Sequence, residues 1–161
     1  MTNKEINIEK YENAILYFIQ NCNGVTLGKT KLNKLLYYLD FVFYRDNKKT
    51  ITRDFYIREQ FGPIPSDVNS VLNKMREKDI IKIDNTINKK GNLSYKFTTY
   101  KKADETAFEK KEFDLLKKIS ITFKNTLTAE LVAQTHLEAP WFYSKPLEII
   151  DFKYAGDIEI I

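Results

Sequence analysis

The segment from Thr30 to Arg45 restricts the fold more than any other part of this chain, because its helical pattern is apolar on two opposite sides. At about 100° per residue, Tyr37, Phe41 and Tyr44 fall on one side. A helix that is apolar on both sides must be buried on both sides. We therefore predict a central helix, whose aromatic stripe is covered either by the rest of the domain or by a partner. The opposite face carries Leu32, Leu35, Leu36, Leu39, Val42 and Phe43.

Shorter patterns along the chain predict the elements that surround this helix. We expect a single α+β domain over residues 1–161, mostly helical, with about five helices around a small antiparallel sheet that includes a basic hairpin. Strand-forming residues predict a strand over 52–58 with Phe55 and Ile57 inward, and a short edge strand over 157–160. The remaining elements are a hairpin over 80–99 and helices over about 8–21, 68–79 (with Ser66 as N-cap), 104–123 and 128–136, where Pro140 stops the last one.

Two closely spaced prolines follow the first predicted strand, in Phe61-Gly62-Pro63-Ile64-Pro65. Each proline fixes its own φ, lacks a backbone donor and restricts the residue before it, so a helix is excluded here. We interpret the segment as a stiff extended turn that orients the third helix. A second interpretation is that Gly62, Pro63 and Pro65 belong to a partner-binding surface.

Residues that could carry out catalysis are scarce. The chain has one histidine, His136, and one cysteine, Cys22, which continues the apolar face of the first helix. A free cysteine on such a face is usually buried and inert. One histidine and one cysteine cannot supply a clustered set of metal ligands, and no glycine-rich phosphate loop occurs. We therefore predict that the protein is not an enzyme and holds no metal and no cofactor.

The same residues indicate a cytoplasmic location. A lone cysteine cannot form an internal disulfide. Polar residues follow Met1 where a signal peptide would have an apolar region. The longest apolar stretch, residues 35–44, is interrupted by Asp40 and is too short to span a bilayer. We expect no contact with a membrane.

Positive charge is concentrated between Val71 and Lys102, where nine Lys or Arg residues accompany three Asp or Glu residues. This excess would attract a negatively charged partner, although a solvated lysine-rich hairpin has the same composition. A third helix followed by a basic hairpin also has the order of a winged helix. The alternative hypothesis is a DNA-binding regulator with weak, sequence-independent binding, because no cluster of base-reading Arg or Asn residues stands out. Its phosphate contacts would come from Lys74, Arg76, Lys78, Lys89, Lys90 and Lys96.

Three motifs occur in a characteristic order. The stretch Thr30–Tyr38 resembles the pattern Lys-Leu-x-Lys-Leu-Leu-Tyr. Residues 61–65 resemble a Tyr-Gly-Pro-x-x-Pro turn, with Phe61 in place of the tyrosine. Thr135, His136, Pro140 and Trp141 match a Thr-His-x-x-x-Pro-Trp segment. Together, over roughly residues 10–145, the chain is similar to the Panacea domain of SocA-like antitoxins from bacteria and phages.

This resemblance implies an antitoxin that binds and neutralises a toxin protein encoded beside it. Some family members are similar to protease adaptors that deliver the toxin for degradation, so a protease or chaperone is a further expected partner. Other members occur in phage genomes. A phage accessory protein that binds a host protein is therefore a second alternative to the antitoxin.

A surface that binds a protein partner needs large aromatic anchors in a patch from which water is excluded. Two places in the sequence offer them. The first is the Tyr37, Phe41 and Tyr44 stripe, which could equally be core. The second is the segment 136–143, where His136 and Trp141 flank Pro140, and we regard it as the safer candidate. In the structural interpretation of that segment, Trp141 caps the core and His136 forms a hydrogen bond with a backbone carbonyl.

Overall fold

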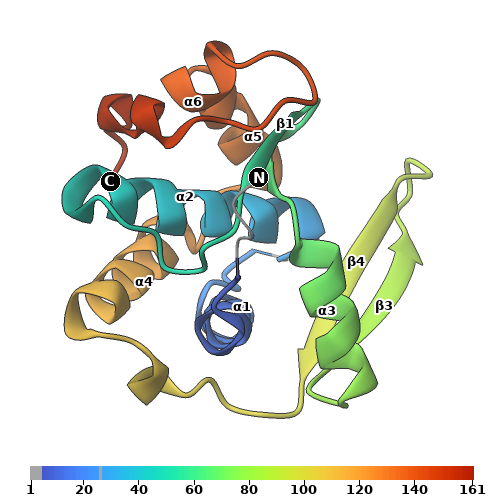
Figure 1. Cartoon of the computed structure of the whole chain (residues 1–161). Coiled ribbons are helices and arrows are strands. Elements are labelled where there is room, and N and C mark those ends of the chain that lie inside the picture. The colour runs from blue at the N-terminus through green and yellow to red at the C-terminus, as the bar shows by residue number, and fades with distance from the viewer. Residues whose placement is uncertain (1–4, 26) are drawn as a thin grey trace.

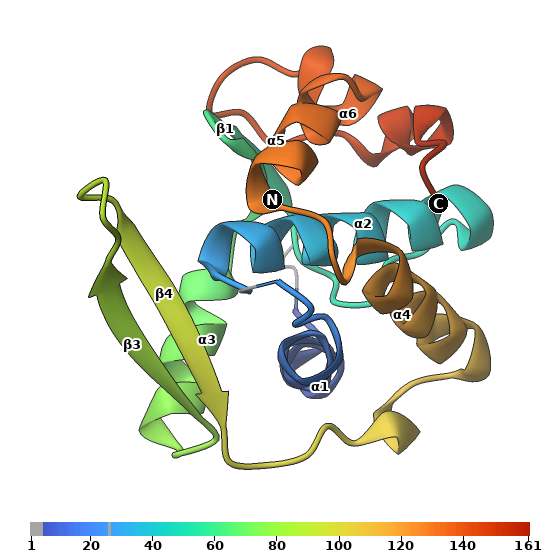
Figure 2. The same cartoon turned by 180° about the vertical axis from the view of Figure 1, so that it is seen from behind.

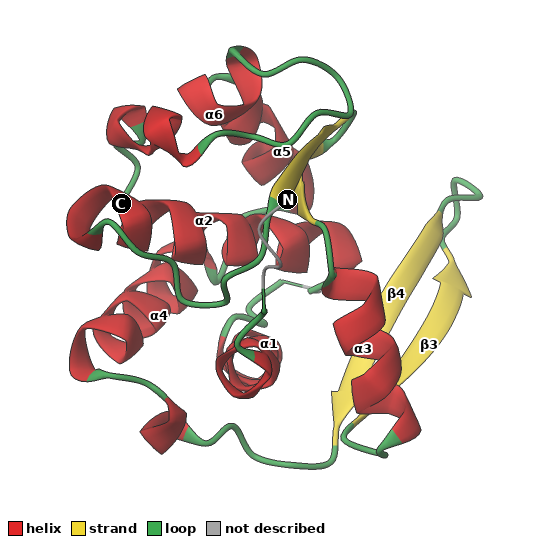
Figure 3. Ribbon diagram, viewed as in Figure 1, coloured by secondary structure: helices red, strands yellow, loops and turns green. Residues whose placement is uncertain are grey.

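The computed structural model describes residues 5–25 and 27–161, and within them the chain has the predicted, mostly helical α+β fold (Figures 1 and 3). A short helix, α6 (Ala139–Phe142), and two 3₁₀ helices, η1 (Glu105–Ala107) and η2 (Phe152–Asp157), complete the helical part. The longer helices are α1 (Ile8–Asn21), α2 (Lys29–Asn47), α3 (Val68–Glu77), α4 (Lys110–Phe123) and α5 (Thr128–His136).

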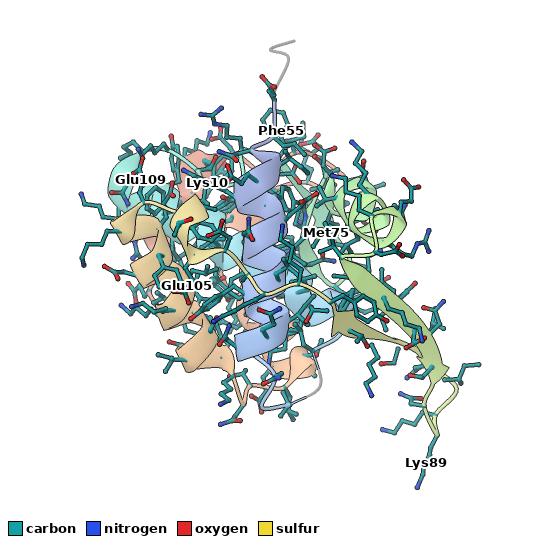
Figure 4. The ribbon with its side chains drawn as sticks, turned by 90° about the horizontal axis from the view of Figure 1, so that it is seen from below. Lys10, Phe55, Met75, Lys89, Glu105 and Glu109 are labelled. Atoms are coloured by element: carbon teal, nitrogen blue, oxygen red, sulfur yellow. The ribbon has the colours of Figure 1, made fainter. Side chains whose placement is uncertain are left out.

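The strands form two separate antiparallel hairpins. β1 (Tyr56–Glu59) pairs with β2 (Gly62–Pro65), so the proline-containing segment predicted as an extended turn is itself a strand. β3 (Ile81–Ile87) pairs with β4 (Leu93–Thr99), and this hairpin is the predicted one. Figure 4 shows the β3–β4 hairpin projecting from the body of the molecule, with Lys89 at its tip.

Helix α2 is the predicted central helix. Its residues from Lys31 to Phe43 are all buried. α1 and α4 pack on one side of it, and α5 and η2 lie on the opposite side (Figures 1 and 2). Tyr37 and Phe41 are fully buried, and the Phe152 ring of η2 lies 4.4 Å from the Phe41 ring and 5.1 Å from the Tyr44 ring. The domain itself therefore covers the aromatic stripe.

Three charged side chains on α2, those of Lys31, Lys34 and Asp40, are buried as well, and each has a specific partner. Lys31 Nζ donates to the backbone oxygen of Thr126 at 2.7 Å. Asp40 accepts hydrogen bonds from the backbone N–H groups of Ile51 and Thr52, at 2.8 and 2.9 Å, and from the Tyr56 hydroxyl at 2.6 Å. A buried carboxylate without such donors would be strongly destabilising, so this network fixes the loop after α2 against the helix.

Two local predictions around β1 and α3 are wrong. The inward residue of β1 is Tyr56, which is fully buried, whereas Phe55 and Ile57 are half-buried. Because Tyr56 points inward, its hydroxyl reaches Asp40. The alternation of residues along a strand cannot reveal that partner. Ser66 does not cap α3. Its hydroxyl donates to Asp54 Oδ1 at 2.6 Å, and Asp67 occupies the N-cap position instead.

Two further elements differ from the sequence-based expectation. The fourth helix begins at Lys110, because Glu109 and Glu112 form a capping box there. Residues 157–160 form no strand: η2 ends at Asp157 and the remaining residues are irregular. α5 ends at His136 as predicted, but the expected stop, Pro140, belongs to the next helix. Pro140 lies in the first turn of α6, where a missing N–H leaves no hydrogen bond unmade.

The buried position predicted for Cys22 is confirmed, and burial raises the pKa of its thiol. In the part of the chain that the structure describes, no helix is both long enough and apolar enough to cross a membrane.

Replacing Asp40 with Ala should destabilise the fold severely. The substitution leaves the N–H groups of Ile51 and Thr52 and the Tyr56 hydroxyl buried without their acceptor, which costs about 3 kcal/mol or more in the free energy of unfolding. Urea denaturation measures this loss. Asp84→Ala is the matched control, because Asp84 is partly exposed and pairs with Lys82 on the surface. A loss for Asp40→Ala within about 0.5 kcal/mol of the control would contradict the assigned role.

Candidate partner-binding surface

The three sequence motifs meet at one point in the structure. Lys34 of α2 donates from Nζ to the backbone oxygen of Pro63 in β2 at 2.9 Å. A Cβ atom added at Gly62 would lie 2.6 Å from Lys34 Cε and 2.6 Å from Thr135 Oγ1 of α5. One residue of each motif therefore contacts the same backbone position. We call Lys34, Gly62, Pro63 and Thr135 the motif junction.

Gly62 is required at this junction for two reasons. Its φ of +106° is a conformation that residues with a side chain rarely adopt. Its α-carbon also faces the Lys34 and Thr135 side chains so closely that a Cβ has no room. The glycine of the second motif thus lets the β1–β2 hairpin approach α2 and α5, as a rigid connector should. Gly62, Pro63 and Pro65 are all buried, so these three candidate residues position the surface from within.

Lys34 is a fully buried lysine, and burial lowers its pKa to about 7. Removing an ammonium group from water disfavours the charged form, and the Pro63 carbonyl compensates for only part of that loss. Near neutral pH the side chain therefore exists in both the charged and the neutral form.

Glu138 connects α2 to the start of α6. Its buried carboxylate accepts hydrogen bonds from the hydroxyls of Tyr37 and Tyr38, both at 3.1 Å, and from Gln134 Nε2 at 3.3 Å. Burial raises the pKa of Glu138, and these three donors oppose the shift. Sequence reasoning missed this residue. It lies inside the segment 136–143, which we considered only for its aromatic, histidine and proline residues.

Trp141 is held from several directions. Its Nε1 donates to the Glu59 backbone oxygen at 2.9 Å, and Arg58 Nε donates to the Trp141 backbone oxygen at 2.9 Å. The Arg58 guanidinium carbon lies 3.7 Å from the centre of the Trp141 ring, where a cation is favoured, and the His136 ring stacks on the same indole at 4.0 Å. Burial, opposed by a hydrogen bond with the Gln60 backbone, lowers the pKa of His136. His136 and Trp141 thus hold α6 against the β1–β2 hairpin.

Beside these internal contacts lies an exposed apolar surface. Leu137, Phe142 and Tyr143 are 80%, 62% and 64% exposed. Together with Ala139 and Asp157 they line one hollow of about 320 Å³. We call these five residues the α6 surface. Contiguous exposed apolar residues with a polar edge are typical of sites that bind proteins.

A family model for the antitoxin SocA-like Panacea domain matches residues 32–142, which include the first motif from Leu32 onward, the other two motifs and every residue of the motif junction. The chain belongs to the SocA-like, Panacea-domain family. Neither a curated protein nor a solved structure matches it. In this Panacea domain the family match begins within α2 and ends with α6, so it spans the segments that the junction holds together.

The six cations of the DNA-binding hypothesis lie elsewhere, on α3, the residue after it and the β3–β4 hairpin, and all six are exposed. Lys78 also pairs with Glu12 at 3.5 Å. Among the described residues, no group of three or more His, Cys, Asp or Glu side chains could hold a metal ion.

Replacing Gly62 with Ala should destabilise the protein by about 2 kcal/mol or more, because both the φ angle and the missing space oppose a side chain. Two other glycines separate these causes. Gly91 has φ of +79° but open space around it, so Gly91→Ala should cost about 1 kcal/mol. Gly156 has neither constraint and its substitution should be nearly neutral. Thermal melts of the three variants rank their losses of stability. Equal losses at Gly62 and Gly91 would show that missing space for a Cβ contributes nothing at Gly62.

The buried Lys34 predicts a distinctive dependence of stability on pH. Between pH about 7 and 10.5, the ordinary pKa of a lysine, the unfolded chain binds a proton at Lys34 more readily than the folded protein does. The stability contributed by this residue therefore rises as pH increases through that window, and it is constant below pH about 7. The Lys34→Met variant has no titrating group at this position and therefore lacks this contribution. From pH about 7 to about 9.5, the melting temperature of the wild type should rise relative to that of the variant. Melting temperatures that change in parallel with pH would contradict the shifted pKa.

Proposed function

We propose that this Panacea domain is an antitoxin that binds and neutralises a cognate toxin protein, and that the α6 surface makes the contact. The observation that carries the proposal is the exposure of Leu137, Phe142 and Tyr143, which follow Thr135 of the motif junction in the sequence and line one hollow. Family membership supports the antitoxin role in general. The segment from His136 to Tyr143, the safer candidate on sequence grounds, contains all three exposed residues.

The chemistry of the α6 surface suits a protein partner. The Phe142 and Tyr143 rings contact each other at 5.2 Å, and Tyr143 also lies 5.9 Å from the Tyr154 ring. Large aromatic side chains supply much of the binding energy in protein interfaces, especially when a polar rim surrounds them. Asp157 provides such a polar group at the edge of the hollow.

The backbone beneath this surface is already ordered before any partner binds. Pro140 fixes its own φ, Trp141 is held by Glu59 and Arg58, and Glu138 is held by two tyrosines. A preordered surface loses less conformational entropy on binding than a flexible one. This favours recognition of a folded partner over capture by a mobile loop.

The polar residues nearby support binding as the mode of action rather than catalysis. Lys34 and Glu138 are buried, at 0% and 5% exposure, and both are used in contacts inside the chain. Trp141 and His136 stack on each other. We place the protein and its toxin in the cytoplasm, where a toxin acting on cell components would be neutralised.

Direct occlusion and delivery to a protease would use the same surface, and so would a phage accessory protein that binds a host protein. They differ in what happens to the partner. Occlusion leaves the toxin intact and inactive, whereas an adaptor shortens its lifetime. A pulse-chase measurement of toxin half-life, with and without this protein, therefore separates them. An unchanged half-life would assign direct occlusion, and a shortened half-life would assign delivery to a protease.

The double substitution Leu137→Ser/Phe142→Ser should abolish rescue. The test expresses the toxin candidate encoded beside this gene in a sensitive host and measures growth and co-purification. Loss of hot-spot side chains of this kind costs on the order of 2–4 kcal/mol of binding, which is about 30-fold or more in affinity. Because both residues are already exposed, the melting temperature of the free variant should stay unchanged.

Ile121→Ser on α4 provides the matched control, since Ile121 is 78% exposed and lies outside the α6 surface. It should retain full rescue. If the wild-type protein neither restores growth nor co-purifies with the toxin candidate, the antitoxin assignment fails. If Ile121→Ser fails as badly as the double variant, the α6 surface is the wrong face.

A further inference from the structure

A polar groove separate from the α6 surface is lined by residues of α2, α3 and the β3–β4 hairpin. Figures 1 and 2 show α3 beside this hairpin. The groove consists of two adjoining hollows of about 250 and 350 Å³, which share Lys29 and Tyr95 in their walls. The first hollow is lined by residues of α2, α3 and both strands of the hairpin. We call the two hollows together the wing groove. The residues that define it in the first hollow are Lys29, Asn69, Asn73, Arg76, Asn85 and Tyr95.

The charge of both hollows favours an anion. Lys29 and Arg76 line the first hollow, Lys29 and Lys31 line the second, and no Asp or Glu belongs to the described wall of either. Burial lowers the pKa of Lys29. An anion beside its ammonium would stabilise the charged form. Cationic hollows with low-dielectric walls concentrate negative ligands.

Amide side chains converge on the first hollow from two elements. Asn69 and Asn73 are four residues apart on α3, so they share a helix face with Arg76, and Asn85 reaches the same hollow from β3. An amide can donate and accept hydrogen bonds side by side, which matches the edges of nucleobases. No such cluster is visible in the sequence, because its members come from separate elements and only the fold brings them together.

An aromatic ring stands where the two hollows join. Tyr95 is half-buried, and Lys29 Nζ lies 5.7 Å from the centre of its ring. Because this ammonium lies over one face of the ring, a planar base would stack on the other face and reach the cation through its phosphate. Stacking on aromatic side chains combined with basic groups along the backbone is the usual way in which proteins hold unpaired bases.

We propose that the wing groove binds single-stranded nucleic acid, with a base on Tyr95, base edges on the asparagine amides and phosphates on Lys29 and Arg76. In a duplex the bases are paired and stacked on each other, so they cannot enter such a hollow. The two hollows meet at Lys29 and Tyr95, so they suit successive nucleotides of one strand. The exposed Lys89 at the hairpin tip extends the positive surface beyond the groove (Figure 4).

The test measures fluorescence anisotropy of labelled mixed-sequence single strands of about 12 nucleotides, DNA and RNA, with the full chain at about 50 and 200 mM salt. We expect wild-type binding that Lys29→Gln/Arg76→Gln weakens roughly ten-fold or more, with a shallower salt dependence. Tyr95→Ala should weaken binding by a similar factor without changing the salt slope, and Tyr95→Phe, which keeps the ring, should retain it. These binding measurements contain no toxin, so their outcome is independent of the proposed antitoxin function.

Lys111→Gln/Lys145→Gln is the control, because it removes the same charge from exposed positions on α4 and after α6. It should bind as the wild type does. Equal weakening by this control, or equally tight binding of a duplex of the same sequence, would show attraction to lysine-rich surface in general and overturn the proposal. Competition by a mononucleotide as effective as that of the strand would assign the groove to free nucleotides instead. Undetectable binding at the lower salt concentration would also overturn it.

Discussion

One long helix buried on every side governs this structure, because its polar side chains must find partners away from water. Lys31 reaches the Thr126 carbonyl ahead of α5, Lys34 reaches Pro63 in β2, and Asp40 gathers the loop after α2 and the Tyr56 hydroxyl. Apolar burial is non-directional and would allow several arrangements of the surrounding segments. The hydrogen bonds of α2 select one arrangement, since each leaves a buried group unsatisfied if its segment is displaced.

In this arrangement, residues that make internal contacts and residues of the exposed α6 surface alternate within a short segment of the chain. Glu138 and Trp141 point into contacts with α2 and β1, and Leu137 and Phe142, next to them in the sequence, remain exposed. The family motifs therefore supply a rigid frame, and the exposed residues between motif positions form the surface that we propose a partner binds. A substitution in the frame should change stability first, whereas a substitution on the surface should change binding alone. Measuring both stability and binding therefore distinguishes loss of toxin binding from damage to the fold.

Elements with strong local signals were predictable from the sequence. The limits of α1 and α5 and the β3–β4 hairpin follow from apolar spacing, breaking residues and a loop with glycine, all of which act over a few residues. Predictions failed where a distant group decided the outcome. Tyr56 turns inward to reach Asp40, and Ser66 gives its hydroxyl to Asp54 instead of capping α3. Similarly, the sequence pointed to the segment around Trp141, but not to Arg58 or Glu138, which hold it in place.

The sequence by itself determined that a helix over residues 30–45 must be buried on both sides, because the period of an α-helix puts apolar residues on opposite faces. It also determined that Gly62 and its two neighbouring prolines form no helix, since proline removes donors and fixes φ. Only the tertiary structure decided what covers the aromatic stripe. Phe152, more than a hundred residues later in the chain, packs on Phe41, and nothing in the local sequence of either residue specifies that contact. The meeting of Lys34, Gly62 and Thr135 was decided in the same way, because a close approach between distant backbones depends on the packing of the whole domain.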